Sequence, residues 1–131
     1  MRRVFFLIQL MLVLVLCGCG TKNKLPDNPT IFEQIENPNG YVCLMTADKI
    51  YVPYCPLETQ YLGDCIGYYD TPADEYTDAT RNYVFTFKGY SPDEWIINTI
   101  GLNNCNEGMI MREINTVNIP DGLSSEYEWN H

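Results

Sequence analysis

From Gly40 onward, short apolar runs rich in β-branched and aromatic residues follow one another between polar turn residues, and one of them alternates with the period of two of a half-buried β-strand. The clearest case is NYVFTFK, residues 82–88, where Tyr83, Phe85 and Phe87 fall on one face that we expect to be core. Other short segments are rich in β-branched and aromatic residues and end at turn residues. The predicted strands are 41–46, 49–54, 62–69, 82–88, 95–100 and 109–114.

The segments between these strands predict two hairpins. Ala47-Asp48 is short enough for a tight turn. Ser91-Pro92-Asp93-Glu94 matches either a helix start or a turn with proline second, and the β-formers that follow favour the turn. Pro53 cannot donate to a ladder, so its strand should lie at a sheet edge or end there. Gly63 and Gly67 indicate bends or close backbone approach.

A different pattern precedes the strands, in residues 20–40. Thr30 followed by Glu33 matches a capping box, which predicts one short helix with Ile31 and Ile35 on one face; the alternative is an extended linker. About six short strands without helical periodicity between them predict a mainly β fold. We therefore expect a small antiparallel sheet, barrel-like or sandwich-like, with at most one short helix near the N-terminus of the mature chain.

The first twenty residues form a leader pattern. Arg2 and Arg3 precede an apolar run, residues 4–16, that is shorter than the about 20 residues needed to cross a bilayer. The run ends in Leu16-Cys17-Gly18-Cys19, which resembles the lipobox of bacterial lipoproteins. The alternatives are an uncleaved signal anchor and an ordinary secretory peptide.

The lipobox resemblance implies that the chain is cut before Cys19 and that the Cys19 sulfur carries a diacylglyceryl group. Gly18 supplies the small residue required before the cut, whereas Leu16 before Cys17 does not. Two acyl chains hold a protein stably on a membrane. The expected organisation is a signal peptide at 1–18, a lipidated N-terminus and linker at 19–40, and one β-rich domain at 41–131.

This organisation places the protein on the extracytoplasmic face of the cell membrane, with Gly20 permitting transfer to the outer membrane of a diderm. The strings YVPY (residues 51–54) and KGY (residues 88–90) resemble hairpin strands of small uncharacterised lipoproteins of Gram-positive type. That resemblance implies no known activity.

Charge narrows the possible partners. The chain has a formal net charge of −9, and loss of Arg2 and Arg3 with the leader leaves 6 basic against 17 acidic residues, near −11. Nucleic acid is not an expected partner, because a basic footprint is missing. The lipid has to supply the tethering, and the acidity should hold the domain away from an anionic surface.

Candidate chemistry is sparse. The single histidine is His131 at the chain end, so histidine-based nucleophilic catalysis lacks a base. The sequence has no C-x-x-C pair of the kind that binds zinc. We therefore expect no metal or cofactor. Outside the cytoplasm, disulfides are permitted, with Cys55 to Cys105 or Cys43 to Cys65 as candidate pairs.

Two further groups of residues are candidates for function. Acidic residues gather at Asp70, Asp74, Glu75 and Asp78, in a segment that matches no EF-hand loop and is expected to be a solvated connection. Exposed tyrosines can form a ligand surface, and those beside predicted loops are Tyr68, Tyr69, Tyr76 and Tyr90; core packing is the alternative.

Together these patterns predict a membrane-anchored cell-envelope lipoprotein that acts as a non-catalytic binding or structural module, with an envelope protein or polymer as partner. The alternative is an envelope hydrolase that acts on cell-wall or extracellular polymer through paired carboxylates. A pocket with convergent titratable groups would favour the hydrolase, and an apolar or aromatic patch would favour the binding module.

Overall fold

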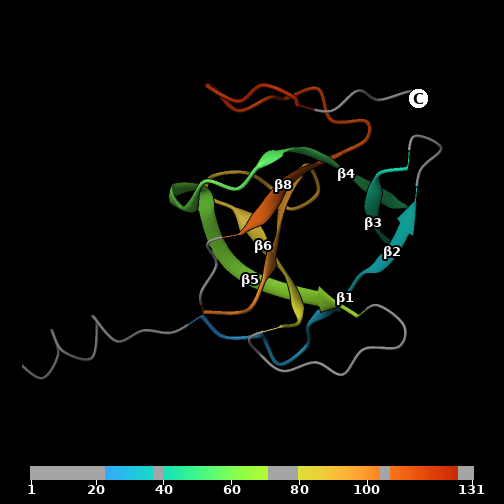
Figure 1. Ribbon diagram of the computed structural model, residues 1–131, viewed down its shortest axis with the longest axis vertical. Helices are drawn as coiled ribbons and strands as arrows, with labels where there is room; N and C mark the ends of the chain where they lie inside the picture. The colour runs from blue at the N-terminus through green and yellow to red at the C-terminus, as the bar shows by residue number, and fades with distance from the viewer. Residues whose placement is uncertain (1–22, 37–39, 71–79, 104–106, 127–131) are drawn as a thin grey trace, which may run out of the picture.

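One β-sheet carries the fold in a computed structural model that describes residues 23–36, 40–70, 80–103 and 107–126 (Figure 1). In these ranges its strands are β1 (Thr30–Ile31), β2 (Glu33–Glu36), β3 (Val42–Thr46), β4 (Lys49–Pro56), β5 (Leu62–Tyr69), β6 (Asn82–Phe87), β7 (Trp95–Ile100) and β8 (Gly108–Glu113). A short 3₁₀ turn, η1 (Thr59–Tyr61), precedes β5. Within the described ranges, no helix has the length and apolar character needed to span a bilayer.

The mainly β prediction is confirmed, because all six predicted strands are present as β3 to β8. The strand order is β1-β5-β6-β7-β8-β4-β3-β2, and every pair except β1 with β5 is antiparallel. The sheet is nearly closed as a barrel.

The closure depends on one segment that forms both edge strands. Only Phe32 separates β1 from β2. β1 pairs with β5 through Thr30 and Gly67, and β2 pairs with β3 through Ile35 and Cys43. The same stretch of chain therefore covers both edges of the sheet.

Of the two alternatives for residues 20–40, the short helix is not formed, because the segment around Thr30 and Glu33 is strand. A capping box stabilises a helix by only about 1 kcal/mol. The strand instead satisfies the hydrogen bonds of two open sheet edges and leaves Phe32 only 4% exposed. The sheet thus begins inside residues 19–40, which we expected to be a lipidated N-terminus and linker.

Both predicted hairpins are confirmed. β3 and β4 pair around a turn at Ala47, whose φ is 48°. β6 and β7 pair around the segment that starts at Ser91, where the Glu94 N–H donates to the Ser91 carbonyl at 3.0 Å and Pro92 is the second turn residue. The helix-start alternative for this segment is therefore not adopted.

The prediction that the strand containing Pro53 lies at a sheet edge or ends there was wrong. β4 lies between β3 and β8 and continues to Pro56. The ladder with β3 ends at Tyr51, and the ladder with β8 shifts register between Pro53 and Cys55. Proline is tolerated at such a bulge, so an interior strand can contain it.

The side chains inside the barrel form one of two buried clusters. This inner cluster contains one residue from each of β3 to β8, together with Phe32 between β1 and β2. Its members are Phe32, Leu44, Tyr51, Tyr69, Val84, Ile96 and Met111. A set with one member from each strand around the ring is what a barrel interior requires.

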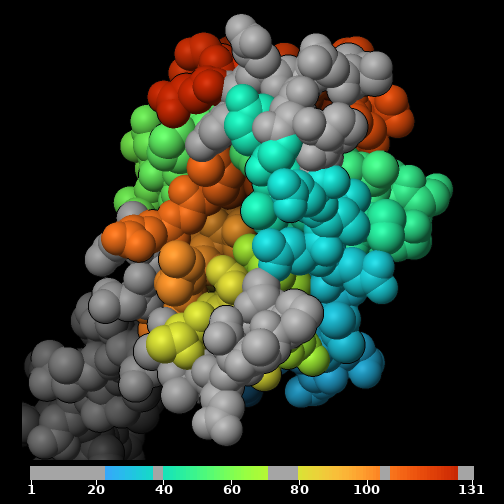
Figure 2. Space-filling model, turned by 45° about the vertical axis from the view of Figure 1, so that its right-hand side comes forward, coloured from blue at the N-terminus to red at the C-terminus, as the bar shows by residue number. Residues whose placement is uncertain are grey.

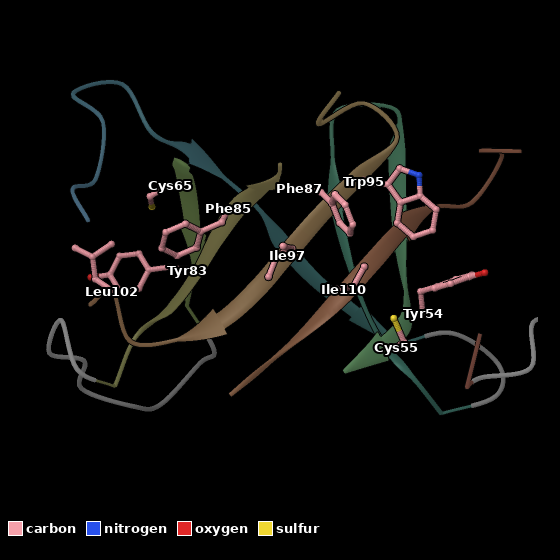
Figure 3. Close-up of a cluster of buried hydrophobic side chains, with 10 residues drawn as sticks. All are labelled: Tyr54, Cys55, Cys65, Tyr83, Phe85, Phe87, Trp95, Ile97, Leu102 and Ile110. Atoms are coloured by element: carbon pink, nitrogen blue, oxygen red, sulfur yellow. The ribbon is translucent and has the colours of Figure 1, made fainter. Parts of the chain in front are cut away.

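The outer cluster lies on the other face of β4 to β8 and is rich in aromatic residues (Figure 3). Its members are Tyr54, Cys55, Cys65, Tyr83, Phe85, Phe87, Trp95, Ile97, Leu102 and Ile110. The predicted core face of β6 is thus confirmed.

The chain before β1 and the chain after β8 cover the outer cluster through Leu25, Ile119 and Leu123. In Figure 1 the blue N-terminal segment lies at the bottom of the view and the red C-terminal segment along the top. The Trp95 indole N–H donates to the Asn118 carbonyl at 2.8 Å, which fixes the C-terminal segment. A turn at Asp121 and Gly122 follows, closed by the Leu123 N–H, which donates to the Pro120 carbonyl at 3.3 Å.

Candidate ligand site at one end of the barrel

A hollow of about 490 Å³ lies at the end of the barrel to which β2, β5 and β7 run and where β3, β6 and β8 begin. Figure 2 shows this face, where the cyan strands β2 and β3, the yellow start of β6 and the orange β7 to β8 region surround a recess. Its lining residues are Gln34, Gly40, Tyr41, Val42, Leu44, Pro53, Tyr69, Asn82, Asn98, Thr99, Ile100, Gly108, Met109 and Met111. Its volume falls within the about 300–1,000 Å³ of small-molecule sites.

The apolar lining extends from the interior to the rim. Leu44 and Met111 are buried members of the inner cluster and also line the hollow. Val42 and Ile100 line it too, yet they are 43% and 49% exposed. Large apolar side chains thus stand in solvent beside an apolar recess, as at sites that bind apolar molecules.

One amide in this lining has an unmet hydrogen-bonding capacity. Asn98 lies on β7 between Val84 of β6 and Met109 of β8. Its Nδ2 donates to the Tyr69 hydroxyl at 2.8 Å, whereas its buried Oδ1 has no hydrogen-bond partner. Leaving a buried polar atom unsatisfied costs about 1–3 kcal/mol, which is tolerated where the atom has a function.

Gly108 keeps the strands close beside this amide. A Cβ on Gly108 would lie 2.2 Å from the Asn98 carbonyl oxygen, far inside van der Waals contact. Only glycine therefore fits where β8 begins against β7.

The types of side chain that line the hollow bear on whether it binds a ligand or catalyses a reaction. No Asp, Glu, Lys, Arg, His or Cys is among the described residues that line this hollow. The available groups are amides, hydroxyls and apolar side chains, which can orient a ligand by hydrogen bonds and exclude water. Among these described lining residues, no carboxylate is placed for proton transfer.

Of the four tyrosines predicted as a ligand surface, the three that the structure describes do not share one surface. Tyr69 lines the hollow, whereas Tyr68, the next residue on the strand, packs against the outer cluster, as does Tyr90. Neighbouring residues on a strand point to opposite faces. The Arg81 guanidinium stacks over the Tyr68 ring, 4.7 Å from its centroid. Tyr76 lies outside the described residues.

The described cysteines are buried thiols. The Sγ atoms of Cys43 and Cys65 donate to the carbonyls of Tyr41 and Gly67, each at 3.6 Å. The predicted bond between Cys43 and Cys65 is therefore not formed. Cys105 lies outside the described residues, and Cys55, the other member of that candidate pair, is a thiol in the structure.

Cys55 is unsuited to nucleophilic chemistry. Burial, assisted by the charges of Glu126 and Glu58, raises the pKa of the Cys55 thiol to about 11. The thiol is therefore protonated at neutral pH, and the thiolate is the reactive form. Cys55 lines a hollow of about 210 Å³ together with both glutamates.

Carboxylates also line a hollow of about 350 Å³ at the opposite end of the barrel, where Asp48 and Asp93 lie beside Tyr51. The Tyr51 hydroxyl donates to the Pro92 carbonyl at 2.8 Å. Burial, followed by the charges of Asp93, Glu113 and Asp48, raises the pKa of Tyr51 to about 12. Tyr51 therefore keeps its proton at neutral pH.

The predicted acidic segment is only partly described. Asp70 accepts a hydrogen bond from Arg81 Nε at 3.0 Å. Asp74, Glu75 and Asp78 lie outside the described residues, as does Cys19. Within the described ranges, no group of three His, Cys, Asp or Glu side chains is placed to hold a metal ion.

The sequence contains a signal for the hollow that the alternation pattern alone did not reveal. In WIINTI, Ile96, Asn98 and Ile100 share one face of the predicted strand, so Asn98 is a polar residue between two isoleucines. A polar side chain on an apolar strand face indicates either a satisfied core amide or a binding site. The structure shows the amide at the hollow, with one atom unsatisfied.

No family model matches the chain, and comparisons with curated proteins and with solved structures find no similar protein.

Proposed function

We propose that this protein is a membrane-anchored cell-envelope lipoprotein and that its barrel is a non-catalytic binding module. The observation that carries the binding part is the hollow at the end of β7, whose described lining is apolar and amide-rich and lacks acidic and basic side chains. Pockets of this composition bind ligands by apolar contact and a few oriented hydrogen bonds. The anchoring part rests on the lipobox, Leu16-Cys17-Gly18-Cys19.

The anchor is tested with two matched cysteine variants. Cys19→Ser removes the acceptor sulfur, whereas Cys17→Ser changes the neighbouring cysteine and leaves Gly18-Cys19 intact. Intact mass spectrometry should find the first residue at Cys19, with a diacylglyceryl group, in the wild type and in Cys17→Ser. Cys19→Ser should lack the added lipid mass.

A wild-type chain that retains Met1, or that carries no lipid, contradicts the proposed anchor. If Cys19→Ser carries the same lipid mass as the wild type, the lipid is attached at another residue.

The alternative, an envelope hydrolase, would use the carboxylates at the smaller hollows, and the pair at the end opposite the main hollow is Asp48 and Asp93. A hydrolase would release soluble fragments from purified cell-wall polymer, and Asp48→Asn with Asp93→Asn would abolish the release. We expect no release by the wild type, because a binding module leaves the polymer intact.

A further inference from the structure

The chain enters the fold very soon after the proposed lipid. The Asn23 side chain donates through Nδ2 to the Leu102 carbonyl at 2.9 Å, and Leu25 packs against the outer cluster. Asn23 is four residues after Cys19 in the sequence. Even a fully extended chain covers at most about 14 Å over four residues. The lipid is therefore attached close to the folded body.

Asn23, the first described residue, is held near the end of the barrel where the hollow lies. Leu102, which holds Asn23, follows Ile100 by two residues, and Ile100 is an exposed residue of the rim. A lipid at Cys19, four residues before Asn23 in the sequence, would hold the mouth of the hollow near the bilayer surface. The second exposed apolar rim residue, Val42, is available for the same contact.

The lining defines what the hollow accepts. A charged group would enter without a described counter-charge, and burial of an unpaired charge is strongly unfavourable. Leu44, Met109 and Met111 offer apolar contact. Asn98 Oδ1 is buried without a partner and Asn98 borders the hollow, so a donor group on a ligand can supply the missing hydrogen bond there.

We propose that the hollow binds an uncharged amphiphile drawn from the membrane, with its apolar chain against Met109 and Met111 and a hydroxyl or amide N–H that donates to Asn98 Oδ1. This inference deepens the proposed function, and its membrane source rests on the anchor at Cys19.

The methionines provide a built-in assay. Met109 and Met111 line the hollow, whereas Met45 lies beside the turn at the other end of the barrel and serves as the internal reference. The full chain, purified from membranes, is labelled with ¹³C-methyl methionine and placed in neutral-lipid nanodiscs. It is titrated with 1-decanol, methyl decyl ether, decyl sulfate and decyltrimethylammonium at matched mole fractions in the bilayer.

We expect decanol to shift the Met109 and Met111 methyl signals and to leave Met45 unchanged. Decyl sulfate and decyltrimethylammonium should bind at least about tenfold more weakly. The ether accepts but cannot donate a hydrogen bond, so it should bind about fivefold more weakly than decanol.

Asn98→Leu should remove the preference for decanol over the ether, and Asn118→Leu, at an exposed position away from the hollow, should retain it. An unchanged Met45 signal in Asn98→Leu shows that the variant is folded. A gadolinium-labelled lipid headgroup should relax Met109 more strongly than Met45, because the mouth faces the bilayer.

The outcomes separate the two proposals. Equal binding of charged and neutral amphiphiles overturns the ligand class and leaves the binding module in place. Stronger relaxation of Met45 than of Met109 overturns the membrane source. Absence of any shift at Met109 and Met111 overturns the ligand inference, whereas a chain without lipid in the intact mass overturns the anchor.

Discussion

The closure of the barrel makes a quantitative prediction at Gly67, where β5 pairs with β1. A Cβ on this residue would lie 1.9 Å from the Thr30 carbonyl oxygen and 3.2 Å from Cε1 of Phe32. The obstacle is backbone, so it cannot move aside as a flexible side chain would. Gly67→Ala must therefore push β1 away from β5.

The expected cost follows from what this displacement disturbs. Forcing a methyl group into a packed site costs about 1–3 kcal/mol. Release of β1 also weakens the bond from the Phe32 N–H to the Tyr68 carbonyl, 2.9 Å long, which is worth about 1 kcal/mol. Partial exposure of Phe32 adds about 1 kcal/mol. We expect a loss of about 3–5 kcal/mol, or roughly 10–20 °C in Tm.

Urea unfolding of the chain that begins at Gly20 measures this loss. The matched control is Gly122→Ala, where no atom lies within 4 Å of the new Cβ and φ is +83°; it should lose about 1–2 kcal/mol from backbone strain alone. Hydrogen exchange of the Phe32 amide should also accelerate in Gly67→Ala. If both variants lose the same free energy, the segment that contains Phe32 does not close the sheet.

Three further predictions concern the hollow and the buried ionisable groups. Asn98→Leu should raise the free energy of unfolding by about 1 kcal/mol in urea titrations, because removal of the unsatisfied Oδ1 outweighs the lost hydrogen bond to Tyr69. A decrease of more than about 1 kcal/mol in this free energy would show that the amide stabilises the fold. Gly108→Ala should destabilise the fold by about 1–3 kcal/mol through its clash with the Asn98 carbonyl and should weaken amphiphile binding; unchanged binding contradicts the placement of the hollow wall. Burial holds the pKa values of Cys55 and Tyr51 at about 11 and 12, above the ordinary 9.0 and 10.0, so the folded chain keeps protons that the unfolded chain loses. The free energy of unfolding should therefore be at its full value below pH 9 and fall by up to about 2 kcal/mol per group as the pH rises to 12. Tyr51→Phe should flatten the decrease in stability between pH 10 and 12.

Strand identity was predictable from the sequence because local alternation and turn residues agree with the final fold. Tyr83, Phe85 and Phe87 form a buried face, and the turn that begins at Ser91 has the geometry that Pro92 favours. These features depend on residues close together in the chain. Reading them needs no knowledge of which strands are neighbours.

Closure was not predictable in the same way. The local pattern at Thr30 and Glu33 favours a helix, and the strand forms only because β5 and β3 present open edges to this segment. The accommodation of Pro53 likewise depends on where the β3 ladder ends and where the β8 ladder shifts. Tertiary pairing overrides local propensity in both cases.

The candidate site was partly accessible from the sequence. The sequence predicts Tyr69 as a ligand residue, but it predicts its neighbour Tyr68 as well, although the two lie on opposite faces of β5. Asn98 could have been found from its position between Ile96 and Ile100. The hollow itself depends on three strand ends that meet only when the barrel closes.

The strands that close the barrel follow the proposed lipid site, Cys19, within one stretch of chain, and this would link the proposed membrane attachment to the integrity of the ligand site. From Asn23, which bonds to Leu102 beside the rim, the chain continues into the strands that seal the barrel on both sides of Phe32. A force on the lipid reaches the bond between Asn23 and Leu102 before it reaches the β1 pairing with Gly67. The rim contact should therefore protect the closing strand, because the parallel β1 ladder is only two residues long, the shortest among the described strands, and parallel pairing is slightly less stable per residue. Asn23→Ala removes that protection, and in the anchored chain it should accelerate hydrogen exchange at the Phe32 amide while leaving exchange at the central β7 amides unchanged.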